Sequence, residues 1–242
     1  ISKLLDDVIL LKNLSIRRFS LISEIESSFF HKLFGDPIIN EKNWDIGLLS
    51  HFIDSFETGK SLRPASNQSF NGPKILKVSS VSSGTYLPEE SKVLPKESLI
   101  DPKWWVKNGD LLFCRANTRE LVGTLAEVTH KDEDRVLPDK IWRFVFAKNY
   151  KNMNPFFICL FRHPSFRREI IKRASGTSGS MLNISKSSVL NIKIIIPPEE
   201  LLEKYCDSIK LIKSKEKAIA KSIELTKSLE ESFYAKIANE DI

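Results

Sequence analysis

The chain has 242 residues, of which 41% are hydrophobic, so it can build a substantial core and is neither a disordered nor a fibrous protein. Lys and Arg total 37 against 31 Asp and Glu, and the resulting net charge of +6 suits a polyanionic partner without requiring one. No apolar run reaches the roughly 18 residues of a membrane span. The cysteines Cys114, Cys159 and Cys206 lie too far apart in sequence to suggest a zinc site. We therefore expect a cytoplasmic protein with no metal site and no cofactor.

Residues 1–34 predict a helix, because they contain no Pro or Gly and their apolar residues recur at helical spacing. Ser15 and Arg18 interrupt this apolar seam, and Gly35-Asp36-Pro37 is typical of a helix stop. The seam positions are Leu4, Val8, Leu11, Ile22, Ile25 and Phe29.

Between about residues 37 and 198, short β-rich runs alternate with turn signals. Two segments, residues 155–161 and 165–174, are instead predicted to be helical, with Asn154 as a helix N-cap before Pro155. Long polar loops at residues 57–71 and 116–120 are natural places for a binding surface. The pattern predicts an α+β fold whose sheet is irregular, with strands at residues 75–81, 111–114, 123–128, 141–147 and 189–196.

Residues 199–238 predict one long helix, which starts after Pro197-Pro198 and contains no further Gly or Pro. A 3-4 spacing of mostly apolar residues gives it the signature of a coiled coil, so it needs a partner helix. Either the N-terminal segment or a second copy of the chain is a suitable partner. The spaced positions are Leu202, Tyr205, Ile209, Ile212, Glu216, Ile219, Ile223, Thr226, Glu230, Phe233 and Ile237.

The sequence contains no motif of a catalytic site. Both the phosphate-binding GxxxxGK[ST] pattern and a GxGxxG turn are missing, and the four histidines show no metal-pair spacing. Asn154-Pro155-Phe156-Phe157 lacks the second Pro of the base-holding loop of amino-methyltransferases, and no Glu-x-Lys follows Pro138-Asp139 as in a nuclease. We therefore expect a protein that is not an enzyme.

Residues 157–198 concentrate positive charge, since they hold seven Lys or Arg and a single acid, Glu169. A solvated helix face and a phosphate-binding face both fit this pattern. The nearby Gly176-Thr177-Ser178-Gly179-Ser180 offers backbone N–H groups that can face an anion. Small polar donors and cations in one region suit contacts that position DNA. The seven cations are Arg162, Arg167, Arg168, Lys172, Arg173, Lys186 and Lys193.

The order of motifs over about 160 residues resembles the target-recognition domain of type I restriction-modification specificity subunits (HsdS). The opening matches are Trp44 with its short apolar segment, Gly59-Lys60-Ser61, and Gly109-Asp110-Leu111-Leu112-Phe113. The closing match is a helix followed by Ala174-Ser175-Gly176-Thr177, then Asn183-Ile184-Ser185, Pro197-Pro198 and a long helix. The chain departs from the family in having Glu199-Glu200 where a Gln commonly follows the two prolines.

The resemblance implies three parts: an N-terminal spacer helix (1–35), a DNA target-recognition domain (36–198) and a coiled-coil spacer helix (199–242). It implies that the middle part reads one half of a bipartite site in double-stranded DNA. The candidate residues for contacts to phosphates or bases are Lys60, Ser61, Arg63, Arg115, Asn117, Arg119, Lys140, Arg143, Thr177, Ser178, Asn183 and Lys186. Asn117 and Asn183 are candidates for adenine edges, because an amide both donates and accepts.

The resemblance also implies partners: methyltransferase subunits docked on the helices, restriction subunits reached through the complex, and a second recognition half. Catalysis then belongs to those partners. A family member carries two recognition domains and this chain has one, so it is either part of a longer subunit or a half-subunit that pairs with itself. The absence of an initial Met favours a fragment. Two alternatives stay open: a recognition domain from a fused single-chain restriction enzyme, and a helical assembly adaptor that does not bind DNA.

Overall fold

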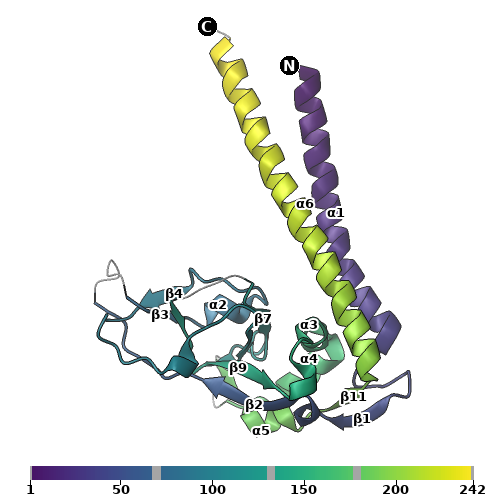
Figure 1. The fold of residues 1–242 in the computed structure, drawn as a ribbon, viewed down its shortest axis with the longest axis vertical. Helices are drawn as coiled ribbons and strands as arrows, with labels where there is room; N and C mark the ends of the chain where they lie inside the picture. Colours follow the sequence, from purple (N-terminus) through teal and green to yellow (C-terminus); the bar gives the residue numbers. More distant parts are fainter. Residues whose placement is uncertain (1, 67–71, 130–133, 177–180, 241–242) are drawn as a thin grey trace. The chain divides into compact units, whose positions relative to one another are not determined.

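The computed structural model describes residues 2–66, 72–129, 134–176 and 181–240. Residue contacts divide the chain into two compact units, a helical one of Ile1–Leu33 with Glu203–Ile242 and a mixed one of Phe34–Leu202 (Figure 1). Helices and sheets occur together, which confirms the predicted α+β class. The division falls near the predicted boundaries at residues 35 and 198, and the three functional parts stay a prediction.

The helical unit consists of two long helices, α1 (Ser2–Phe34) and α6 (Glu199–Glu240), which run antiparallel and side by side (Figure 1). The ring of Tyr205 on α6 packs against two rings of α1, with centroid distances of 5.5 Å to Phe29 and 5.9 Å to Phe30. Phe30 and Tyr205 are both fully buried. The N-terminal segment therefore supplies the partner helix that α6 requires.

The buried positions of these helices agree only in part with the predicted seams. Leu202, Tyr205 and Ile209 are buried as expected, and so is Val8 in α1. Leu11 is 54% exposed and Ile25 is 48% exposed, so the α1 seam is wrong at these two positions.

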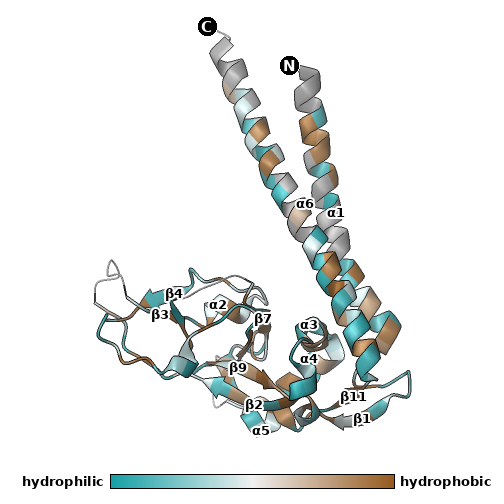
Figure 2. Ribbon diagram, in the orientation of Figure 1, coloured by the Kyte–Doolittle hydropathy of each residue, from teal (hydrophilic) through white to brown (hydrophobic). Residues whose placement is uncertain are grey.

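Helix α1 is continuous through Ser15 and Arg18, where the apolar spacing lapses. Figure 2 shows polar and apolar residues mixed along both helices, without an extended purely apolar stretch. The structure does not describe the side chains of several predicted seam positions, namely Leu4, Ile22, Glu216, Ile219, Ile223, Glu230, Phe233 and Ile237.

The mixed unit is built around a four-stranded antiparallel sheet in the order β2-β9-β5-β7. The side chains of the inner strand β5 are all buried, as its apolar sequence predicts. Helix α3 (Asn154–Arg162) covers this sheet through Phe161, whose ring lies 5.9 Å from Phe113 and 5.6 Å from Phe144. Helix α4 (Pro164–Arg173) follows it directly. The strands are β2 (Ile53–Thr58), β5 (Leu111–Cys114), β7 (Leu125–Glu127) and β9 (Ile141–Phe146).

Three smaller sheets complete the unit. They pair β1 (Asp45–Leu48) with β11 (Lys193–Ile196), β6 (Ala116–Asn117) with β10 (Leu182–Asn183), and β3 (Lys74–Leu76) with both β4 (Ser91–Val93) and β8 (Arg135–Val136). The short helices are α2 (Ser79–Ser82), α5 (Lys186–Leu190) and the 3-10 turns η1 (Leu49–His51), η2 (Pro102–Trp104) and η3 (Lys148–Tyr150).

Two of the predicted strands are partly helical, and serine hydroxyls form local hydrogen bonds in both helical parts. Residues 75–81 form a strand only as far as Leu76, and α2 follows, where the Ser82 hydroxyl donates to the main-chain oxygen of Val78. Residues 189–196 begin inside helix α5, because the Ser185 hydroxyl caps that helix by accepting from the N–H of Ser188. Serine favours such local turns over extended strands.

Three further local expectations are wrong. The predicted loop at 57–71 begins only after β2 ends at Thr58, and the loop at 116–120 begins with strand β6. Asn154 is not a helix cap, since Met153 occupies that position. The Asn154 amide instead donates to the main-chain oxygen of Gly109 and to Glu127, which ties α3 to the sheet.

Candidate nucleic-acid interface

Most of the predicted DNA-contacting residues lie at one end of the four-stranded sheet. The antiparallel register places Thr58 opposite Trp142 and Cys114 opposite Ile141, so the ends of β2 and β5 meet the start of β9. The chain continues from these points into segments that carry the candidates Lys60, Ser61, Arg63, Arg115 and Lys140. The topology thus gathers residues that are distant in sequence.

Backbone contacts hold these segments together. The N–H of Gly59 donates to the Pro138 oxygen at 3.2 Å, and the N–H of Arg115 donates to the Lys140 oxygen at 3.1 Å. A Cβ atom on Gly59 would lie 1.7 Å from the main-chain oxygen of Leu137, so this close approach requires glycine. The Gly59-Lys60 motif therefore has a structural cause. Lys60, Ser61 and Arg63 are exposed, and the ammonium of Lys60 lies 5.7 Å from the Trp104 ring centroid.

The β6–β10 ribbon brings Asn183 and Lys186 to the same end of the sheet. Ala116 pairs with Asn183, and the N–H of Ile184 donates to the Arg115 oxygen at 3.0 Å. The Lys186 ammonium donates to the main-chain oxygen of Phe56 at 2.8 Å. Asn183 and Lys186 are both exposed. Thr177 and Ser178, predicted in the same region, lie outside the described residues.

Arg115 is the most extensively held of the candidates that stay partly exposed. Its Nε donates to the main-chain oxygen of Asp139 at 2.9 Å, and its Nη1 donates to Oδ1 of Asn183 at 3.5 Å. Its Nη2 lies 3.8 Å from the Asp139 carboxylate, and the side chain stays 28% exposed. The guanidinium is therefore fixed in orientation while part of it faces solvent.

Trp142 supports two of the cations from within the sheet. The Arg115 guanidinium lies 5.9 Å from its ring centroid and the Lys186 ammonium 5.7 Å, both within cation–π range. The ring itself is 5% exposed and stacks on Phe113 at 5.6 Å. Sequence reasoning missed Trp142 and Asp139 as members of this site. The adjacency of Asp139 to the basic Lys140 is a weak signal, and no local pattern marks Trp142.

Arg143, another residue predicted to contact DNA, occupies a different environment. It is 7% exposed, and its guanidinium forms ion pairs with Glu57 and with Asp110, the latter at 2.9 Å. Its remaining N–H groups donate to the main-chain oxygens of Lys103 and Trp105. Burial raises the pKa of the Asp110 carboxyl, although its hydrogen bond from Arg143 acts in the opposite direction. Arg143 therefore joins strands and loops in the core.

Asn117 is also engaged within the fold. Its amide nitrogen donates to the Ser82 hydroxyl at 2.8 Å, and its amide oxygen accepts from the N–H of Thr118 at 2.8 Å. This use of both amide groups disfavours the predicted adenine contact. Arg119 is exposed on the following turn, which Arg167 of α4 fixes by donating to the main-chain oxygens of Val122 and Glu120.

The basic stretch of residues 157–198 divides into structural and exposed cations. Arg162 and Arg167 donate to main-chain oxygens, and Arg173 pairs with Glu169 four residues earlier. The exposed cations of this stretch include Arg168, Lys172, Lys186 and Lys193. The exposed cations fit a solvated surface and a phosphate-binding face equally, so the phosphate-binding face stays a prediction.

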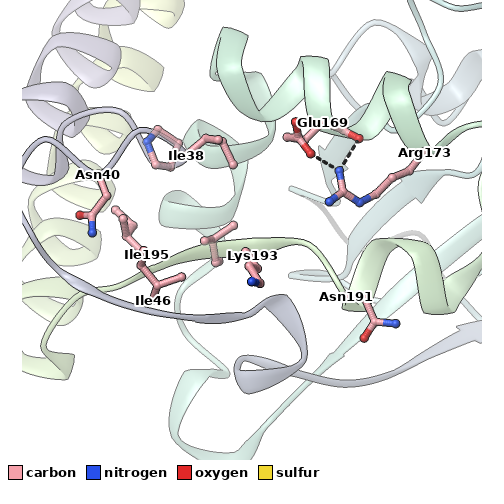
Figure 3. Close-up of a pocket in the computed structure, with 10 residues that line it drawn as sticks. Ile38, Asn40, Ile46, Glu169, Arg173, Asn191, Lys193 and Ile195 are labelled. Carbon is pink, nitrogen blue, oxygen red and sulfur yellow. Dashed lines mark hydrogen bonds and ion pairs between the residues drawn. The ribbon is translucent and has the colours of Figure 1, made fainter.

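A pocket of about 370 Å³ lies between the turn after α1, the β1–β11 ribbon and helix α4 (Figure 3). Its lining is mixed, with apolar residues such as Ile38, Ile46 and Ile195 and an equal number of polar ones. Glu169 in its wall pairs with Arg173, which lowers the pKa of the Glu169 carboxyl, so this group is not a proton donor at neutral pH. Among the described residues no cluster of His, Cys, Asp and Glu is suited to a metal ion, and no helix is long and apolar enough to cross a membrane.

An α+β unit with fixed cations at one end of its sheet, in a chain that also contains a pair of long helices, is a candidate nucleic-acid recognition module. No family model matches the chain. Its sequence is similar to the type I restriction enzyme EcoEI specificity subunit of Escherichia coli, with 27% identity over 171 residues, which cover 69% of this chain and 28% of that protein.

Solved structures of specificity subunits share the fold. The S subunit of a type I restriction-modification system from M. genitalium aligns with a TM-score of 0.57 and 11% identity, over 95% of this chain and 57% of that one. The HsdS subunit from Thermoanaerobacter tengcongensis aligns with a TM-score of 0.54 and 13% identity, over 97% and 55%. The predicted resemblance to type I specificity subunits is therefore confirmed. The chain spans slightly more than half of these solved chains.

Proposed function

We propose that this chain is a DNA-recognition module of a type I restriction-modification specificity subunit, and that it reads one half of a bipartite site. The observation that carries the proposal is the donor cluster at the sheet end, where Arg115, Asn183 and Lys186 are held together by the β6–β10 ribbon and by Trp142. Fixed donors of this kind suit both phosphate oxygens and the acceptor edges of bases.

The proposed interface comprises the predicted residues that remain accessible, with Asp139 and Trp142 as supports. Its members are Lys60, Ser61, Arg63, Arg115, Arg119, Lys140, Asn183 and Lys186. Thr177 and Ser178 stay in the proposal on sequence grounds alone. Arg143 and Asn117 are left out because their polar groups bond within the fold.

The long helices complete the proposed role. They set the spacing to a second recognition half, either in the same polypeptide or in a second copy, and they offer a docking surface for methyltransferase subunits. Restriction subunits join through the assembled complex. In this proposal the chain performs no catalysis itself and acts in the cytoplasm, where the methyltransferase and endonuclease partners modify or cut the DNA.

Selection from a random-sequence DNA pool tests the proposal. The 242-residue chain is co-expressed with a type I methyltransferase subunit, and the bound duplexes are sequenced after several rounds. Enrichment of one short half-site is the expected result, and a matched selection with the methyltransferase subunit alone is the control. Failure to enrich any sequence in the presence of the partner contradicts the proposal and favours the alternative of a helical adaptor.

A recognition domain from a fused single-chain restriction enzyme predicts the same enrichment. It differs in requiring no separate methyltransferase chain. Binding that is equally strong with and without the co-expressed subunit therefore favours that alternative.

A further inference from the structure

The donors of the interface are arranged asymmetrically around Arg115. On one side, Nε of Arg115 donates to the main-chain oxygen of Asp139. The guanidinium also lies 5.9 Å from the ring centroid of Trp142, within cation–π range. Nη1 reaches Asn183 and Nη2 lies beyond hydrogen-bond distance from Asp139, at 3.8 Å. Within the described part of the chain, three of its four terminal N–H groups therefore have no hydrogen-bond acceptor.

The guanidinium of Arg115 is a planar group of hydrogen-bond donors whose orientation is already restricted before DNA binds. Contacts to phosphates position a protein on the duplex and carry no sequence information directly. Restricting the guanidinium before binding reduces the entropy lost when it forms two parallel hydrogen bonds. The held geometry of Arg115 is the arrangement that bidentate recognition of a base edge requires.

The neighbouring groups limit which base this site can read. The Oδ1 atom of Asn183 accepts from Arg115, so its Nδ2 remains as a donor, and Lys186 is a donor only. Adenine presents one acceptor and one donor in the major groove, so it matches the fork of Arg115, which can only donate, less well than a base with two acceptors does. Guanine presents two acceptors, N7 and O6, and matches a set of donors.

We infer that Arg115 is a specificity-determining residue that reads guanine, so that the half-site bound by this domain contains a G·C pair. The inference rests on the proposed function. Asp139 acts as a positioning residue for the guanidinium. Its main-chain oxygen accepts from Nε of Arg115 at 2.9 Å, and its carboxylate, 3.8 Å from Nη2, suits the N4 amine of the cytosine that pairs with the guanine.

The test measures how tightly protein variants bind the selected half-site, and how tightly altered half-sites are bound. Arg115→Lys keeps the charge and removes the fork, and it is expected to lower the discrimination for one G·C position about tenfold, while affinity for random DNA stays within about twofold. Lys148→Ala is the matched control, since Lys148 is exposed and follows β9 at the opposite end of that strand from Ile141.

A second measurement uses the wild-type chain and does not depend on the folding of a variant. Each guanine of the half-site is replaced by 7-deazaguanine, which lacks the N7 acceptor. One replacement is expected to weaken binding about tenfold, and the Arg115→Lys chain is expected to lose this sensitivity.

The outcomes separate the inference from the proposed function. A selected half-site without guanine, or one that tolerates every 7-deazaguanine, overturns the role of Arg115 and leaves sequence-specific binding intact. A wild-type chain that enriches no half-site overturns both.

Discussion

Arg143 shows how one buried side chain joins distant segments of the mixed unit. Its guanidinium contacts Glu57 of β2, Asp110 before β5 and two main-chain oxygens, so five donors serve four groups of the fold. Arg143→Met is expected to reduce the free energy of unfolding by about 3 kcal/mol, because both carboxylates lose their counter-charge. Urea denaturation measures this, with the exposed Lys148→Met as the control. Equal stability of the two variants would contradict the structural role.

Asp36 makes stability depend on acid pH. Burial opposes its ionisation, but the N–H groups of Ile39 and Ile38 donate to its carboxylate, and the net effect lowers the pKa of the Asp36 carboxyl. The charged form therefore stabilises the fold above the unfolded pKa of about 3.9, and this contribution disappears as the pH falls through the lower folded value.

Asp36→Asn tests that direction. The variant is expected to be less stable than the wild type at pH 7, and the difference should shrink as the pH falls below about 4. Urea denaturation at several pH values measures it, with Asp54→Asn, an exposed residue of β2, as the control. A difference that does not vary with pH contradicts the account.

The sequence indicates which residues are available for an interface, and the structure decides which remain accessible. Arg115 follows strand β5 and Arg143 lies within β9, but these positions alone do not show which guanidinium is buried. Arg143 differs from Arg115 because it pairs with two acids, Glu57 and Asp110, that are distant from it in sequence. The support of Arg115 by Trp142 depends on the same long-range pairing.

At the scale of elements, the helices were easier to predict than the strands. The absence of Gly and Pro over residues 199–238 and a regular apolar spacing predict α6 directly, and the structure extends it to Glu240. Strands of two to four residues give too few positions for a period, and parts of two predicted strands are instead the short helices α2 and α5. The β6–β10 ribbon, which organises the interface, has two residues per strand and left no recognisable pattern.

The aromatic contact between α1 and α6 is expected to hold the helical pair together. Tyr205→Ala removes a buried ring that lies 5.5 Å from Phe29 and 5.9 Å from Phe30, and it should lower the stability of the pair by about 3 kcal/mol. Leu211→Ala, at a position 60% exposed on the same helix, should change it by less than about 0.5 kcal/mol. Thermal unfolding followed by circular dichroism compares the two. A larger effect at Leu211 would contradict the pairing.

At the scale of the whole molecule, the proposed function is divided between two units. In that proposal the mixed unit presents the cations, and the helical unit sets the spacing and binds the partners. Both units are similar in fold to specificity subunits over nearly the full chain, while the chain spans slightly more than half of those subunits. A second recognition half is therefore part of the proposal, and a bipartite DNA site should bind more tightly than either of its halves.

The salt dependence of binding is the most direct test of DNA recognition by this chain. The affinity of the chain, with its methyltransferase partner, is measured for the selected half-site and for a scrambled duplex over a range of salt concentrations. We expect the affinity for both duplexes to fall steeply as salt rises, because phosphate contacts release counterions. The selected sequence should bind more tightly than the scrambled duplex at each salt concentration. An affinity that ignores salt, or equal binding of the two duplexes, would contradict sequence recognition by this chain.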